Sequence, residues 1–409
     1  MKLRKMLARP VCIFVLFFAC GLAAAQTRSN ASFALKNGER VVFLGNSLFE
    51  NDFQYGYLEL ALTTRWPDRD IIFRNLGWTG DNVYGVARST ITNPPTGYDL
   101  LMEHLTKAQP TLVFVAYGGI EAQDDEAGLP FFREGLIKLL DKIDQLGANA
   151  ILVSPMPILL PDSSQNVAKR NAMLETYATA IAQLASARGK RYIDIFKPIQ
   201  EISKKVSLTD NGIHLNDVGY YHLATIFEQS LGLGPRNQPI TITAGKVPAV
   251  TSGPAKMLNA GDNTTTNLSF TVNDSLLPLP RPTDDRAVGS DAPIVTIKGL
   301  KKGYYTLTAD QEQLISASAK EWENGVAIKQ GATFVQAREL QQMIVKKNDL
   351  FFFQYRPLNT TYILGFRSYE QGRHVKGLEE QSILIKWLEG QIALSRKPKS
   401  RIYQLTPLK

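Results

Sequence analysis

Residues 40–48 read Arg-Val-Val-Phe-Leu-Gly-Asn-Ser-Leu, a short and nearly all-apolar run that ends in Gly45, Asn46 and Ser47. Continuous apolar runs of this length are typical of strands that are buried on both faces of a parallel sheet. Polar residues directly after such a strand lie at the edge of the sheet where α/β proteins bind ligands. The stretch therefore indicates a fold class and also the place where chemistry is expected.

Further strands are predicted downstream, and helical patterns separate them. The strand candidates are rich in Val, Ile and Phe, and they span Asp70–Asn75, Pro110–Tyr117, Ala148–Ser154 and Arg191–Ile195. Apolar residues recur at helical spacing over Leu129–Leu146, Asn171–Arg188 and Asp217–Leu231. This alternation of strands and helices predicts βαβ units, and hence an α/β domain built on a parallel sheet.

The first 25 residues have the layout of a secretory signal peptide. Four basic residues precede an apolar run over Val11–Leu22, and Ala23–Ala25 fits the small-residue cleavage pattern, with Gln26 as the new N-terminus. Two alternatives stay open: a retained anchor, for which the run is short, and a lipid on Cys20. We expect export to the periplasm or the medium, with no stable membrane insertion after cleavage.

Composition excludes several classes of protein. The 409 residues are 44% hydrophobic and 21% charged, which is a globular composition with room for two or three domains. Removal of the leader takes away four basic residues and no acidic one, and the remaining Lys and Arg are scattered, so we expect no nucleic-acid partner. Both cysteines, Cys12 and Cys20, lie in the leader. With no zinc-type spacing and no phosphate loop, no metal or cofactor is expected.

The amino-acid composition of the sequence changes near Gly234. Residues 235–292 are rich in Pro, Thr, Asn and Asp, and short alternating runs predict a small β-rich module. Helices are expected near Val335–Lys346 and Leu378–Ser395, with an aromatic run at Leu350–Tyr355 between them. The predicted division is a signal peptide at 1–25, an α/β domain at 26–234, the β-rich module at 235–330 and a C-terminal helical and aromatic segment at 331–409 that packs on the α/β domain.

Glycine-containing segments follow several of the predicted strands. Asn-Leu-Gly-Trp-Thr-Gly-Asp at 75–81 follows the second, Gly118–Glu121 the third and Thr209–Asn216 the fifth. Glycine lets backbone N–H groups approach a reacting oxygen. His214 lies in the last of these loops, and together with Ser47 it becomes a candidate general base. The structural alternatives are a helix-capping Ser47, ordinary turn glycines and a structural histidine.

These blocks, taken in order, resemble the SGNH (GDSL-type) hydrolase family over about residues 38–232. The resemblance implies a three-layer α/β/α, flavodoxin-like fold with a five-stranded parallel sheet, and hydrolysis of acyl esters without a metal. It implies that Ser47 is the nucleophile, that Ser47 and Gly80 give backbone oxyanion donors, and that His214 is the base. Candidate substrate contacts are Asn46, Trp78, Gly119 and Glu121.

Three positions depart from the family pattern. Asn46 stands where the family has Asp, and Ile120 stands where an Asn gives a side-chain oxyanion donor, a loss that costs about 10²–10³ in rate in a measured case. Asn211 stands where an acid precedes the histidine; its carbonyl oxygen can accept a hydrogen bond from the imidazole, or Asp210 takes this role. An Asp→Asn change in a serine-protease triad costs about 10⁴ in rate.

Two functions compete on these grounds. The first is an exported serine esterase for small acyl esters, such as O-acetyl groups on carbohydrate. The second is a catalytically impaired SGNH-fold protein that binds carbohydrate or protein. Residues 43–47, 74–81 and 208–216 also resemble an exported bacterial subgroup of the family, as do residues 355–372, which implies that this tail belongs with the hydrolase-like domain.

Three further groups have two interpretations each. Glu50 and Asp52 either face the pocket or are ordinary carboxylates in the first turn of a helix. Trp78 either stacks on a sugar ring or packs in the core. Polar and aromatic residues of the tail either cover the edge of the active site or seal a domain interface; they are Arg356, Asn359, Tyr362 and Arg367.

Overall fold

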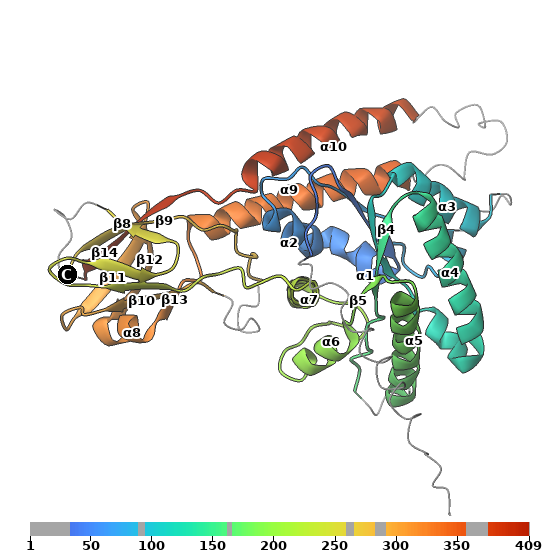
Figure 1. The fold of residues 1–409 in the computed structure, drawn as a ribbon, viewed down its shortest axis with the longest axis horizontal. Coiled ribbons are helices and arrows are strands. Elements are labelled where there is room, and N and C mark those ends of the chain that lie inside the picture. Colours follow the sequence, from blue (N-terminus) through green and yellow to red (C-terminus); the bar gives the residue numbers. More distant parts are fainter. Residues whose placement is uncertain are drawn as a thin grey trace, which may run out of the picture. The chain divides into compact units, whose positions relative to one another are not determined.

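The structure is a computed structural model, and it describes residues 33–88, 95–161, 166–258, 266–282, 292–356 and 375–408. The predicted leader and the tail residues 357–374 lie outside the described residues. A five-stranded sheet with the order β2-β1-β3-β4-β5 forms the centre of the first domain, and every pair in it is parallel (Figure 1). This is the flavodoxin-like strand order.

The strands of this sheet lie where the apolar runs predicted them. They are β1 (Arg40–Gly45), β2 (Ile72–Asn75), β3 (Leu112–Ala116), β4 (Asn149–Val153) and β5 (Arg191–Ile193). All of β3 is buried, and β1 is buried from Val41 onward. Side chains on both faces are covered, which explains why the sequence of these strands shows no alternation.

Helices cover both faces of the sheet. Those of the first domain are α1 (Ser47–Glu50), α2 (Tyr57–Arg65), α3 (Gly97–Ala108), α4 (Leu129–Gln145), α5 (Val167–Ala187), α6 (Phe196–Ser203) and α7 (Asp217–Ser230). On one face, Val42 and Leu44 join a core with apolar residues of α3, α4 and α5. On the other face, Phe43 packs against Phe49 of α1, whose ring meets Phe227 of α7. The three-layer α/β/α prediction is confirmed.

A β-rich region follows, with two sheets of order β13-β10-β6-β7 and β12-β11-β14-β9-β8. The elements are β6 (Ile240–Thr243), β7 (Ala249–Ser252), β8 (Ala255–Met257), β9 (Leu268–Val272), β10 (Ile294–Lys298), β11 (Tyr304–Ala309), β12 (Glu312–Ser318), α8 (Ala319–Asn324), β13 (Val326–Ala327) and β14 (Arg401–Pro407). Ile242, Phe270, Leu307 and Leu405 share its core.

The last strand of this region was not predicted from the sequence. β14 comes from the C-terminal residues and pairs with both β9 and β11. The sequence does not show the alternation of buried and exposed residues clearly. Tyr403 and Leu405 are buried, but the apolar Ile402 lies on the exposed face. Residues beyond the predicted module at 235–330 therefore complete its sheet.

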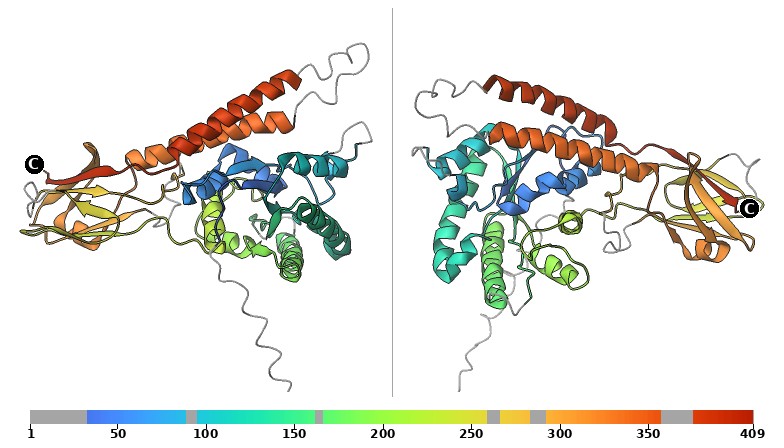
Figure 2. Two further views of the ribbon diagram at one scale, coloured as in Figure 1. Left: turned by 45° about the horizontal axis from the view of Figure 1, so that its top comes forward. Right: turned by 180° about the vertical axis from the view of Figure 1, so that it is seen from behind.

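Two long helices precede β14. α9 (Ala332–Tyr355) is longer than predicted and includes the aromatic run, and α10 (Val375–Ser395) lies beside it (Figures 1 and 2). Lys347 of α9 contacts both carboxylate oxygens of Glu59 in α2 at 2.7 Å, and both side chains are buried. α9 thus packs on the first domain. Among the described helices, none has the length and apolar character needed to cross a bilayer.

Candidate active site

A cavity of about 380 Å³ lies beyond the carboxyl ends of β1, β3 and β4. Ser47 and His214 both line it, and so do Asn46 and Gly119. Its apolar wall includes Leu48, Ile120, Met156, Ile158, Leu174 and Ile213. Polar side chains also reach it, namely Asn51, Gln123, Asp125 and Arg170. The topology therefore brings Ser47 and His214, 167 positions apart in the chain, to one hollow.

Ser47 is the first residue of the short helix that follows β1. Asn46 precedes it as the cap, and its Oδ1 accepts the backbone N–H of Leu48 at 3.2 Å. The backbone N–H of Ser47 has no acceptor among the described residues, so it is free to donate to a ligand in the cavity. Capping is thus carried by Asn46, which leaves the Ser47 side chain available.

The loop after β2 is anchored against β1 and α1. Asn75 donates from Nδ2 to the carbonyl of Phe49 at 2.6 Å and accepts the N–H of Gly77 on Oδ1 at 2.8 Å. A Cβ at Gly77 would collide with the backbone of Glu50, so only glycine fits there. Gly80, farther along, is exposed at a φ of +78°. Its N–H has no acceptor in the described part of the chain, but Gly80 is not among the residues that line the cavity.

Glu121 is a positioning group here, which corrects its interpretation as a substrate contact. Its Oε1 accepts the N–H of Val83 at 3.0 Å, and its Oε2 accepts the N–H of Gly118 at 2.8 Å. The carboxyl group therefore joins the loop after β2 to the loop after β3. Glu121 is 7% exposed and does not line the cavity. Burial raises its pKa to about 7.

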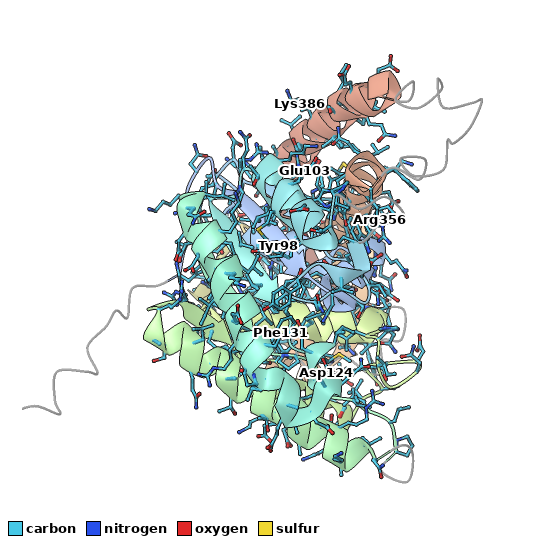
Figure 3. All side chains as sticks on the ribbon, turned by 90° about the vertical axis from the view of Figure 1, so that its right-hand side faces the viewer. Tyr98, Glu103, Asp124, Phe131, Arg356 and Lys386 are labelled. Carbon is cyan, nitrogen blue, oxygen red and sulfur yellow. The ribbon has the colours of Figure 1, made fainter. Side chains whose placement is uncertain are left out.

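Trp78 does not line the cavity either, and its role as a platform for a sugar ring stays a prediction. The guanidinium of Arg356 lies over its ring at 3.7 Å from the centroid, and the ring of His104 stacks on it at 6.1 Å. Arg356, labelled in Figure 3, lies at the C-terminal end of α9. It also donates to Glu50 at 3.0 Å. Glu50 and Arg356 therefore seal the contact between α9 and the loop after β2, whereas Asn359, Tyr362 and Arg367 lie outside the described residues.

A buried network beneath this loop was missed by the sequence analysis. Asp81 accepts from Arg88 Nε at 2.7 Å and from the Tyr117 hydroxyl at 3.1 Å, and both members of the ion pair are fully buried. Arg88 also donates to the carbonyl of Leu76 at 2.9 Å and to Nδ1 of His104 at 3.1 Å. Burial and the Arg88 charge lower the pKa of His104 to about 4, so its imidazole is neutral and can accept.

His214 lies exposed in the loop before α7, and Asn211 holds it. Oδ1 of Asn211 accepts the backbone N–H groups of Ile213 at 3.0 Å and of His214 at 2.8 Å. Nδ2 of the same amide lies 3.2 Å from Nδ1 of His214. Because an amide nitrogen can only donate, the ring nitrogen accepts. This corrects the expectation that the Asn211 carbonyl oxygen accepts from the imidazole.

Asp210 does not take the place of the missing acid. Its Oδ1 accepts from Nδ2 of Asn216 at 3.1 Å, and Asn216 in turn caps α7. Among the described contacts, no hydrogen bond joins Ser47 to His214. Such bonds are often long in unliganded enzymes and tighten when substrate binds. The loop thus presents His214 to the cavity with Asn211 as its partner.

Comparisons with known proteins agree with this geometry. Residues 43–221 match the profile of the GDSL-like lipase/acylhydrolase family. A solved structure described as a gut microbial diltiazem-metabolizing enzyme is 17% identical, covers 92% of this chain and 99% of that chain, and has a TM-score of 0.68, which shows a shared fold. An acetylxylan esterase from Geobacillus stearothermophilus is 17% identical over 49% of this chain and 98% of its own, at a TM-score of 0.41. No curated protein matches the chain.

The family match begins in β1 and ends in α7, so it includes the cavity and both Ser47 and His214. The strand order, the cavity at the carboxyl ends of the strands and the family profile lead to one conclusion. Residues 43–221 match the GDSL-like lipase/acylhydrolase family, and this match supports SGNH-type serine ester hydrolysis at the level of that family.

Proposed function

We propose that this protein is an exported esterase that hydrolyses small acyl esters, with O-acetyl groups on carbohydrate as its substrate class. The observation that carries the proposal is the placement of Ser47 and His214 in one cavity, with the Ser47 N–H free to donate. In this account Ser47 is the nucleophile and His214 the general base. The Gly80 N–H, which has no acceptor among the described residues but does not line the cavity, is the second backbone donor in this proposal.

The chemistry follows the two-step route of serine hydrolases. His214 takes the proton of the Ser47 hydroxyl as its oxygen attacks the ester carbonyl. The negative charge then forms on the carbonyl oxygen, beside the N–H donors of Ser47 and Gly80. When the intermediate collapses, the alcohol leaves with the proton from His214. Water, activated by the same imidazole, then releases the acid and restores the serine.

The cavity supports a small ester with a polar alcohol. A volume of about 380 Å³ is near the lower end of ligand pockets, which range over about 300–1,000 Å³. Its apolar wall, which includes Ile120 and Met156, suits a short acyl group. Asn51, Gln123 and Arg170 offer hydrogen bonds at the same cavity, and a hydroxyl-rich alcohol such as a sugar would use them.

Export and domain organisation complete the proposal. The basic and apolar pattern of residues 1–25 supports cleavage before Gln26 and transport to the periplasm or the medium. N-terminal sequencing of the protein recovered from its native host tests this, and an intact Met1 would contradict it. The division into 26–234, 235–330 and 331–409 is proposed together with the contribution of β14 to the middle region.

Hydrolysis of p-nitrophenyl acetate by the chain from Gln26 tests the enzymatic proposal. Turnover is expected to fall to background in both Ser47→Ala and His214→Ala, while thermal unfolding stays close to that of the parent chain. Equal hydrolysis in the parent chain and Ser47→Ala would contradict the mechanism. It would favour the second candidate, a carbohydrate- or protein-binding role for the same cavity, which the hydrogen bond from Asn211 to Nδ1 of His214 also supports.

A glycan array separates this second candidate from the first. Ser47→Ala removes turnover without altering the rest of the cavity, so the array is run with this variant. Binding of acetylated glycans alone fits a substrate of the esterase, because the variant holds the ester without cleaving it. Binding that does not depend on acetylation fits the binding role, and an array without any bound glycan counts against it.

A further inference from the structure

In the proposed oxyanion site, an apolar side chain stands where a hydrogen-bond donor is expected. Ile120 follows β3 and lines the cavity, and its side chain cannot donate a hydrogen bond. Two backbone N–H groups, of Ser47 and Gly80, are then the remaining donors in the proposed mechanism. Loss of one donor from such a site costs about 10²–10³ in rate. A side-chain donor close to Ile120 would replace the missing hydrogen bond.

Asn46 meets this requirement. Its Oδ1 is committed to the N–H of Leu48 at 3.2 Å, so the planar amide directs Nδ2 the other way. A Cβ built on Gly119 would lie 3.4 Å from this Nδ2. Gly119 precedes Ile120, and all three residues line the cavity. Nδ2 has no acceptor among the described residues, so its two hydrogens are available there.

We infer that the Asn46 side chain supplies the oxyanion donor that Ile120 cannot provide, an inference that rests on the proposed esterase function. The residue acts in two ways through one amide. The oxygen caps α1 and keeps Ser47 in place, and the nitrogen donates to the developing oxyanion at the Gly119 side of the cavity. Asn46 is thereby a catalytic residue.

The capping role alone does not account for an amide at this position. Asp, Ser and Asn cap helices about equally well, so a cap can do without Nδ2. An ionised Asp could only accept, whereas the Asn46 amide accepts from Leu48 and also has an N–H donor on the Gly119 side of the cavity. A carboxylate at position 46 would present acceptors only and would repel a negatively charged oxygen. With Ile120 after β3 and Asn46 after β1, the side-chain donor for the oxyanion therefore lies at the end of β1 instead of the end of β3.

A double-mutant cycle on p-nitrophenyl acetate hydrolysis tests the inference. Asn46→Ser keeps a good cap but removes Nδ2, and it is expected to lower kcat by about 10²–10³ with little change in KM. In the Ile120→Asn background the new amide replaces the lost donor, so the same substitution is expected to cost less than about 10-fold. Ser47→Ala runs in parallel and reports whether there is enzymatic turnover to analyse.

Gly119→Ala gives a second test that needs no new polar group. Its added methyl would lie 3.4 Å from Nδ2 of Asn46, an ordinary contact distance, so the fold is expected to stay intact while the donor is covered. We expect kcat to fall and the unfolding temperature to hold. Gly147→Ala makes the same substitution away from the cavity, where a Cβ meets nothing within 4 Å but the φ of +74° is strained, so it reports on stability alone.

The outcomes are distinct. Turnover in the parent chain that vanishes in Ser47→Ala, together with the predicted cycle, supports both claims. Turnover that vanishes in Ser47→Ala but survives in Asn46→Ser within about 3-fold overturns the donor role and leaves the esterase in place. An equal cost of Asn46→Ser in both backgrounds overturns it as well, because the two amides would then not substitute for each other. No turnover above Ser47→Ala overturns both.

Discussion

The side-chain amide of Asn211 donates a hydrogen bond to Nδ1 of His214 across 3.2 Å. The amide cannot turn over, because its oxygen accepts the backbone N–H groups of Ile213 and His214. With Nδ1 as an acceptor, a neutral imidazole carries its proton on Nε2. Nε2 is the nitrogen that takes the serine proton in a Ser-His pair, so the resting loop favours the unproductive tautomer.

Asn211→Asp is predicted to raise kcat for acyl esters. A carboxylate keeps the bonds to the two backbone N–H groups and accepts from Nδ1–H of His214, which frees Nε2. The reverse change in a serine-protease triad costs about 10⁴ in rate, so we expect a gain of about 10² or more. Steady-state hydrolysis of p-nitrophenyl acetate measures it.

Asp210→Asn is the matched control for this substitution, because Asp210 contacts Asn216 and not His214. Its kcat should stay within about 3-fold of that of the parent chain. A fall in kcat for Asn211→Asp, or an equal effect of the two substitutions, would show that the tautomer of His214 does not limit the reaction.

The ionisation of Glu121 predicts a pH dependence of stability. The folded protein keeps the Glu121 proton up to about pH 7, whereas the unfolded chain releases it near the ordinary value of 4.5. The folded state therefore binds more protons between these values, and the free energy of unfolding falls as the pH rises through this window. The contribution is complete below pH 4.5 and is lost above about pH 7.

Glu121→Gln removes the ionisable carboxyl group and should weaken that slope. The full effect is about 3 kcal/mol at most, since one pKa unit corresponds to about 1.4 kcal/mol. Urea unfolding at several pH values between 4.5 and 7.5 measures it in both proteins. Identical slopes would mean that the Glu121 carboxyl ionises freely in the folded state.

The buried pair between α9 and α2 is predicted to support the first domain. Lys347→Met leaves the buried Glu59 carboxylate without its cation, which typically costs about 3–5 kcal/mol of unfolding free energy. Lys346→Met, one position earlier on the exposed face, should change it by less than about 0.5 kcal/mol. Chemical unfolding of the two variants gives the comparison, and similar small effects would show that α9 contributes little to the stability of that domain.

The Asp81–Arg88 pair should behave as one unit under the loop that carries Gly80. Arg88→Met strands a fully buried carboxylate, and we expect a loss of about 3–5 kcal/mol in the free energy of unfolding. Asp81→Asn with Arg88→Met removes both charges, so the double variant should lose less than the sum of the single losses. Strict additivity in chemical unfolding would contradict a direct coupling between the two side chains.

Much of the fold was predictable from the sequence, because the central strands are buried on both faces and read as continuous apolar runs. β14 was not, because its partners β9 and β11 come from distant parts of the chain and only two of its residues, Tyr403 and Leu405, are buried. The sequence predicted Ser47 directly after the first strand, as the structure has it, and the His214 loop after the fifth strand, where the structure has α6 between β5 and that loop. Both residues line one cavity.

The remaining details of the site depend on geometry that no local pattern reports. Arg88 lies in a short 3-10 helix without periodicity, and its partners Asp81 and His104 are found only in the folded chain. Stacking on a sugar was one of two interpretations of Trp78. The sequence around Trp78 does not show that a guanidinium group lies over its ring. The direction of the Asn211 amide likewise depends on two backbone N–H groups of its own loop.

The most direct test of Ser47 as the nucleophile is peptide mass mapping after incubation with a fluorophosphonate, which forms a stable covalent bond with an activated serine. We predict one modified residue, Ser47, with no modification in Ser47→Ala and much slower labelling in His214→Ala. A chain that stays unlabelled, or that is labelled at a different serine, would contradict it.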